Sequence, residues 1–240
     1  MNSQVSFTEK GMTNQSGWTI ILAYIFIPTL ISIISLSISD SILSKSISIL
    51  IGAIVFLIVI FFAVNETRMN LFNTIDNKWV KYLLLSILLI IGYYFLNFIL
   101  NIILASIYSS ANDLTIWEFW GKPTSINQQE VENIVKSTPA MSFFSIVLLT
   151  PLMEEIVFRQ GIFLVNKDKR IATLISIVVF TLVHMIGTIG NPENLWYIGS
   201  YILIATSLTF IYNWTDEKLA YSHASHILIN LVAYIVLMAN

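Results

Sequence analysis

The segment from Pro151 to Gly161, PLMEEIVFRQG, places two adjacent carboxylates and an arginine inside an otherwise apolar stretch. Ionisable side chains are expensive at membrane depth, so they usually face a protected interior and mark a site. On a helix, Glu155 and Arg159 are four residues apart and can pair, whereas Glu154 points about 100° away. Pro151 removes a backbone hydrogen bond and is expected to bend or loosen this helix. The pattern predicts one neutralised carboxylate beside another that has no local partner.

The composition of the chain is that of a membrane protein. Of its 240 residues, 56% are hydrophobic and 11% are charged, whereas soluble domains carry about 25% charged residues. The net charge of −2 gives no indication of nucleic-acid binding. The absence of cysteine excludes disulfides, thiolate metal sites and a cysteine nucleophile. We therefore expect an all-α, polytopic membrane helical bundle.

Seven stretches of the chain are long and apolar enough to cross a bilayer, which takes about 20 residues. They cover residues 17–39, 46–64, 79–107, 138–165, 170–187, 194–213 and 219–239. The Ile/Ser-rich region 31–50 is the one segment of low complexity. In the long connection 109–137, Ser125 could cap a short interfacial helix, and Trp117, Phe119 and Trp120 precede it. This connection is compatible with a structural lid and with a gate that faces the substrate.

Basic residues in the loops predict the orientation of the chain in the membrane. With a cytoplasmic N-terminus, eight of these residues lie inside and three lie outside. The inner set is Lys10, Arg68, Lys78, Lys81, Lys167, Lys169, Arg170 and Lys218, and the outer set is Lys45, Lys122 and Lys136. This bias favours a cytoplasmic N-terminus and an external C-terminus.

Further polar residues lie in the last predicted spans. His184 is in the fifth span, while His226 and Asn230 share one helix face of the seventh, one turn beyond His223. A carboxylate and a histidine from different helices can hold one water and remove its proton. His226 and Asn230 could then stabilise the oxyanion that forms when water attacks a peptide carbonyl.

A metal provides an alternative chemistry for the same residues. Glu154, His184 and His226 could bind zinc, whose fourth position would hold the attacking water. Both mechanisms describe hydrolysis of an amide within the membrane, and the residue types leave both open.

Three short motifs occur in a fixed order on successive hydrophobic helices. EEIVFR fits EExxxR, Phe180 to His184 fits FxxxH, and His226 to Asn230 fits HxxxN. In this order they resemble the CPBP family of intramembrane proteases, over roughly residues 138–239. That family includes the type II CAAX prenyl endopeptidases, the lysostaphin-resistance-protein-like members, and bacteriocin-processing and self-immunity proteins. One departure is Gln160, where an arginine–glycine pair is common and the glycine here follows at 161.

The resemblance implies a role for each motif residue. Glu154 would activate the water with help from His184, and His226 and Asn230 would form the oxyanion site. Glu155 and Arg159 would support the motif. Residues 138–239 would be the catalytic core of a single membrane domain, 1–240, with N-terminal helices and an interfacial loop in 1–137. Since both metal-dependent and metal-free mechanisms have been proposed for the family, zinc is a possible cofactor and none is certain.

The expected function is an intramembrane endopeptidase in a bacterial cell membrane, with a membrane-associated peptide or protein as its substrate. A catalytically inactive scaffold or bacteriocin-immunity protein of the same fold is one alternative, although degenerate members would be expected to lose motif residues. A small transporter is another, but its polar residues should be spread along a pathway. The predicted spans also place His184 nearer the outer membrane face than Glu154, whereas catalysis requires the two to meet.

Overall fold

Every regular element in the described part of the chain is a helix. The structure, a computed structural model, describes residues 14–39, 41–64, 77–111, 126–186 and 197–239. Its helices are α1 (Asn14–Ile38), α2 (Ile42–Ala63), α4 (Trp79–Ala111), α6 (Ile126–Ser137), α10 (Lys169–Met185), α11 (Ile198–Trp214) and α12 (Leu219–Ala239). A continuous helical stretch of five pieces precedes α10: α7 (Pro139–Ser142), η2 (Phe143–Leu149), α8 (Thr150–Glu155), η3 (Ile156–Gly161) and α9 (Ile162–Val165). The predicted all-α fold class is confirmed.

Five of the seven predicted spans are helices long and apolar enough to cross a membrane. They run over residues 14–38, 42–63, 79–107, 139–165 and 219–239, and they identify an integral membrane protein. The other two, α10 and α11, are helices of 17 residues each, so their membrane crossing stays a prediction. The orientation also stays a prediction, because Lys10, Arg68 and Lys122 lie outside the described residues.

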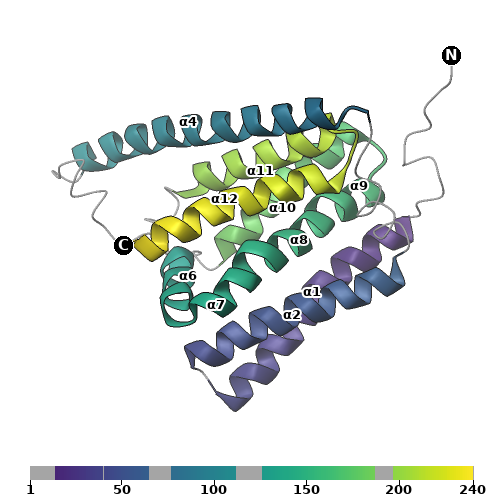
Figure 1. Ribbon diagram of the computed structural model, residues 1–240, viewed down its shortest axis with the longest axis vertical. Helices are drawn as coiled ribbons and strands as arrows, with labels where there is room; N and C mark the ends of the chain where they lie inside the picture. The colour runs from purple at the N-terminus through teal and green to yellow at the C-terminus, as the bar shows by residue number, and fades with distance from the viewer. Residues whose placement is uncertain (1–13, 40, 65–76, 112–125, 187–196, 240) are drawn as a thin grey trace.

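The helices form a bundle with a distinct pair on one side. Helix α4 runs along one edge and the α1–α2 hairpin along the opposite edge, with the stretch α7–α9, α10, α11 and α12 between them (Figure 1). Helix α4 packs on α11 and α12, and α1 packs on α2, η3 and α9. Helix α6 lies against α2 and α12. It forms as predicted from Ile126 onward, whereas Ser125, Trp117, Phe119 and Trp120 lie outside the described residues.

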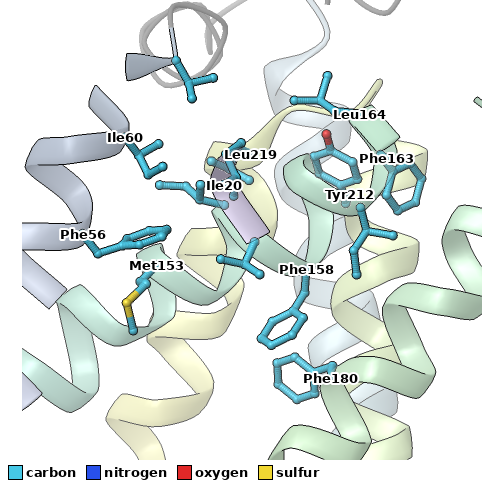
Figure 2. Packing of buried hydrophobic residues seen from close by; sticks show 14 of the residues in the cluster. Ile20, Phe56, Ile60, Met153, Phe158, Phe163, Leu164, Phe180, Tyr212 and Leu219 are labelled. Carbon is cyan, nitrogen blue, oxygen red and sulfur yellow. The ribbon is translucent and has the colours of Figure 1, made fainter. Parts of the chain in front are cut away.

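Buried apolar side chains join the hairpin to the central helices. Phe56 of α2 and Ile20 of α1 face the stretch that carries Met153 and Phe158 (Figure 2). The ring of Phe158 meets the ring of Phe180 from α10 edge to face, with centroids 5.2 Å apart. Such aromatic pairs add stabilisation beyond the area they bury. The core thus fixes η3 and α10 against each other directly beside the two carboxylates.

Helix α1 crosses η3 and α9 at very short range because two glycines face the crossing. A Cβ on Gly17 would lie 2.7 Å from the carbonyl oxygen of Gly161 and 2.9 Å from the backbone nitrogen of Val165. A Cβ on Gly161 would in turn lie 3.0 Å from a methyl group of Ile20. Small residues at a helix crossing let the backbones approach closely in membranes. The close packing of α1 against η3 therefore explains the glycine at position 161, directly after Gln160.

A strained turn between α11 and α12 sets the position of α12. Asp216 and Glu217 have positive φ angles of 55° and 58°. The carboxylate of Asp216 accepts hydrogen bonds from the hydroxyl of Tyr82 and, at 2.9 Å, from the ammonium of Lys78. The Tyr82 hydrogen bond is the main cause that lowers the pKa of Asp216. Since Glu217 also pairs with Lys169, the start of α12 is tied to both α4 and α10.

We predict that Gly17→Ala destabilises the protein, because its methyl group would collide with backbone atoms that cannot rotate away. Overpacking of this kind costs about 1–3 kcal/mol. The matched control is Gly92→Ala in α4, where an added Cβ meets nothing within 4 Å. Thermal unfolding in detergent should show a lower midpoint for Gly17→Ala and an unchanged or higher one for the control. Equal midpoints for the two variants would show that the crossing is not tight.

Candidate active site

Two π-helical segments, η2 and η3, flank the short α8 helix that carries Glu154 and Glu155. At the end of η2, the backbone N–H of Thr150 donates to the carbonyl of Ser145, five residues back. Wide turns of this type are rare and often occur at functional sites. The loosening predicted at Pro151 therefore takes the form of a wider helix just before it, without a break.

The carbonyl of Ile146 loses its usual partners at this point. Thr150 donates to Ser145 instead, and Pro151 has no N–H to donate. The side-chain amide of Asn230 from α12 donates to the Ile146 oxygen at 3.0 Å. A buried carbonyl needs such a partner, and this one fixes Asn230 beside the carboxylates.

Glu155 is fully buried and contacts two charged or chargeable groups. Its Oε2 lies 3.3 Å from Nε of Arg159, so the predicted pair at a spacing of four residues is confirmed. Its Oε1 accepts a hydrogen bond from Nδ1 of His226 at 3.0 Å. Arg159 is also fully buried, and its Nη2 donates to the carbonyl of Ala205 at 3.5 Å. Glu155 thus connects η3 to α12 behind the site.

Phe180 lies between Arg159 and His184. The guanidinium carbon of Arg159 is 4.8 Å from the Phe180 ring centroid, which is within the range of a cation–π contact. The ring of His184 stacks on Phe180, with centroids 4.2 Å apart and an interplanar angle of 22°. In addition, Nδ1 of His184 donates to the Phe180 carbonyl at 2.8 Å. These contacts fix both the plane and the tautomer of His184.

The carboxylate of Glu154 lies between two imidazole rings. Oε1 is 3.8 Å from Nε2 of His184, and Oε2 is 3.6 Å from Nε2 of His226. Residues from two other helices, α10 and α12, therefore converge on this carboxylate. The predicted span boundaries placed His184 and Glu154 at different depths in the membrane, whereas the structure brings their side chains within 3.8 Å of each other.

The three residues open into a cavity of about 510 Å³, which we call the site cavity. Asn230 also lines it, and four tyrosines form much of its remaining wall: Tyr93, Tyr197, Tyr201 and Tyr234. Helix α6 contributes the apolar residues Val131, Ile134 and Val135. Among the described residues that line it, Glu154 is the one carboxylate, and neither lysine nor arginine is present.

All six predicted site residues lie in one region. The four predicted catalytic residues line the site cavity, while the two predicted supports, Glu155 and Arg159, lie buried behind it. The contacts of Phe180 were missed, although its place four residues before His184 puts both on one helix face. The tyrosine wall carries no local signal in the sequence. His223 stands outside the cavity lining, with Nε2 3.5 Å from the carbonyl of Leu148.

Within the described ranges, no three His, Cys, Asp or Glu side chains are arranged to hold a metal ion. Nε2 of His184 is free to accept, since Nδ1 donates to a carbonyl, but His226 lies between two carboxylates. Zinc held by Glu154, His184 and His226 stays a prediction that metal analysis can test.

The candidate site lies within a segment of the chain that matches a known protein family. A family model described as "Type II CAAX prenyl endopeptidase Rce1-like" matches residues 136–232, which include all of the predicted site residues. This match confirms the predicted family resemblance. No solved structure matches the chain.

Two curated relatives carry no established activity in their names. An uncharacterized protein of Mycoplasma capricolum is 22% identical over 194 residues, which cover 80% of this chain and 56% of that protein. The UPF0177 protein YxdF of Lactococcus lactis is 35% identical over 66 residues, which cover 28% of this chain and 33% of that protein. The chain therefore spans about half of the first relative and a third of the second.

We predict that Glu155→Gln strongly destabilises the protein, because it leaves the charge of Arg159 buried without a counter-ion. Removing one partner of a buried ion pair costs about 3–5 kcal/mol. The matched control is Glu132→Gln, since Glu132 also pairs with a cation four residues on, Lys136, but at the exposed surface. That pair should contribute about 0.3–0.5 kcal/mol. A thermal midpoint in detergent that falls equally for both variants would contradict the supporting role of Glu155.

Proposed function

We propose that the protein is an intramembrane endopeptidase that hydrolyses a peptide bond of a membrane-associated protein or peptide. One observation carries the proposal: the Glu154 carboxylate lies between Nε2 of His184 and Nε2 of His226 at the wall of a cavity. The match of residues 136–232 to a family of CAAX endopeptidases supports the same reaction class.

The attacking water would lie between Glu154 and His184. Their 3.8 Å separation exceeds a direct hydrogen bond, and polar groups at such a distance are often bridged by water. Because Nδ1 of His184 donates to the Phe180 carbonyl, its Nε2 carries a lone pair in the neutral ring. Two acceptors would then draw on the two protons of one water, and Glu154 would take one as the water attacks.

The donors for the oxyanion would be His226 and Asn230. His226 has a carboxylate near each ring nitrogen: Nδ1 donates to Glu155, and Nε2 lies beside Glu154 at the cavity, from where an N–H would reach the oxyanion. Asn230 donates one amide hydrogen to Ile146 and retains a second. Both donors would stabilise the charge that develops on the substrate carbonyl oxygen.

The proton balance of the reaction closes on Glu154. The carboxylate takes a proton from water as the C–O bond forms and gives it to the leaving nitrogen as the C–N bond breaks. The products are a carboxylic acid and an amine. Apart from Glu154, His184 and His226, the described residues that line the site cavity carry no acidic or basic side chain, so the substrate residues beside the cut bond should be uncharged. A peptide precursor in a bacterial membrane is the substrate that fits the predicted location.

Glu154→Gln should abolish cleavage and leave the thermal midpoint close to that of the wild type. The amide keeps the shape but cannot remove a proton, and a general base contributes about 10²–10⁴-fold to rate. The test is digestion of a proteome-derived peptide library by purified protein in detergent, with new peptide ends identified by mass spectrometry. Glu132→Gln, at the exposed surface, is the control. Equal cleavage by Glu154→Gln and wild type would remove the proposed mechanism.

The same preparation tests the metal alternative. Bound zinc in stoichiometric amount, with cleavage lost on chelation and restored by zinc, would make Glu154, His184 and His226 ligands. Cleavage that survives chelation but is lost in Glu154→Gln supports the metal-free base. If the wild type cuts no peptide with or without zinc, the scaffold or immunity function is favoured over the protease.

Phe180→Leu tests whether the stack positions His184. Leucine keeps an apolar side chain of similar size but loses both the guanidinium contact and the ring stack. Misplacing a catalytic group by about 1 Å can cost 10²-fold, so we expect kcat to fall about 10–100-fold with little change in KM. Phe62→Leu in α2 is the control, because Phe62 is 73% exposed on the outside of the bundle. A purely structural role would instead lower the thermal midpoint and leave kcat of the folded fraction unchanged.

A further inference from the structure

A second cavity of about 750 Å³ lies where α1, α2 and α6 meet. Five of its nine lining residues are polar, which is unusual for helices that face a membrane. We call it the serine cavity, and its polar lining residues are Ser32, Ser35, Lys45, Ser48 and Glu130. The Ile/Ser-rich region 31–50 supplies all of these except Glu130. The segment that composition singled out as low in complexity therefore builds a specific surface.

The serine cavity and the site cavity share a wall. Ile49 of α2 and Val131 and Ile134 of α6 line both cavities. These are uncharged aliphatic side chains, and aliphatic side chains can change rotamer without breaking a hydrogen bond. The serine cavity therefore adjoins the site cavity, and these three aliphatic side chains lie between the two.

The chemistry of the serine cavity suits a peptide backbone better than a lipid chain. A hydroxyl both donates and accepts hydrogen bonds, so a row of serines can serve the N–H and C=O groups of an extended strand. Such groups cost several kcal/mol each when they are left unsatisfied in the membrane, whereas an acyl chain needs no polar partner. Ser32 and Ser35 lie one turn apart on α1, and Ser48 of α2 lines the same cavity. The hydroxyls of Ser35 and Ser48 donate within the hairpin to the carbonyls of Ser44 and Lys45, so these two serines offer acceptors for peptide N–H groups.

The charges in the serine cavity are balanced. Nζ of Lys45 is 3.7 Å from Oε1 of Glu130, and this pair joins α2 to α6. One cation and one anion together give no strong preference for the net charge of a ligand. The lining therefore suits an uncharged, polar stretch of peptide.

We infer that the serine cavity is a binding site for the substrate chain beyond the cleaved bond, and that it holds an extended, uncharged polar segment. This inference rests on the proposed endopeptidase function and deepens it. The segment would enter along the serines of α1 and α2 and pass Ile49, Val131 and Ile134 to reach Glu154. Specificity would then depend on the substrate's length and its polar segment as well as on the residues at the cut bond.

The first test separates long from short peptides. Ser32→Leu places an apolar side chain in the serine cavity, and Ser37→Leu, at an exposed position outside its lining, is the control. For peptides of about twelve residues, which span about 40 Å when extended, Ser32→Leu should raise KM about five- to tenfold, the effect of one or two lost hydrogen bonds. Peptides of four residues should keep their wild-type kinetics. An equal KM change for both lengths, or none for either, would overturn the inference.

The second test measures binding without cleavage. The chain has no cysteine, so Ser32→Cys in the Glu154→Gln background can be labelled by a maleimide at one position. A pool of twelve-residue peptides should slow labelling several-fold, a four-residue pool should not, and labelling of Ser37→Cys should be unaffected by either. If the long peptides slow labelling but the wild type cleaves no peptide, the protease function would be refuted and the peptide-binding site would be supported. Cleavage without protection, or equal protection by added phosphatidylglycerol alone, would refute the peptide site.

Discussion

The buried carboxylate of Glu155 holds the candidate site together. A charge in an apolar interior is tolerated only with partners, and Glu155 has two, Arg159 and His226. Arg159 in turn stands over the ring of Phe180, on which His184 stacks. The orientation of both histidines beside Glu154 therefore depends on one side chain that does not line the cavity itself. In the proposed mechanism the two adjacent carboxylates therefore have different roles: Glu155 organises the site and Glu154 reacts.

The backbone of the helical stretch around Pro151 also helps to position the site residues. The π-helical turn before Pro151 redirects the N–H of Thr150 and leaves the carbonyl of Ile146 to Asn230. A regular α-helix without proline would satisfy that carbonyl internally and offer Asn230 nothing to bind. The glycines at the α1 crossing act in the same direction, since they let α1 support η3 at close range. The irregular helix is therefore stabilised from both sides by features that a regular helix would not need.

Features that depend on helical periodicity and hydrophobicity could be predicted from the sequence. All seven predicted spans contain helices, and the spacing of Glu155 and Arg159 predicted their ion pair. Residue spacing could not reveal the π-helical turns, because the side chain that takes up the freed Ile146 carbonyl, Asn230 of α12, is distant in the sequence. Depth was also misjudged: the boundaries separated His184 from Glu154, whereas their side chains reach within 3.8 Å. Hydropathy locates a helix along the chain but not the height at which two helices meet.

The serine cavity is a second feature that the sequence alone could not predict. Serines in an apolar helix are weak signals, because each can bond a carbonyl of its own helix, as Ser48 does with Lys45. They become a shared polar surface only once α1, α2 and α6 are packed together. A hydrolase in a membrane has to bring both water and a polar peptide backbone to its carboxylate. In the proposed function, the hydroxyls of the serine cavity, which adjoins the site cavity at Ile49, would help to supply that need.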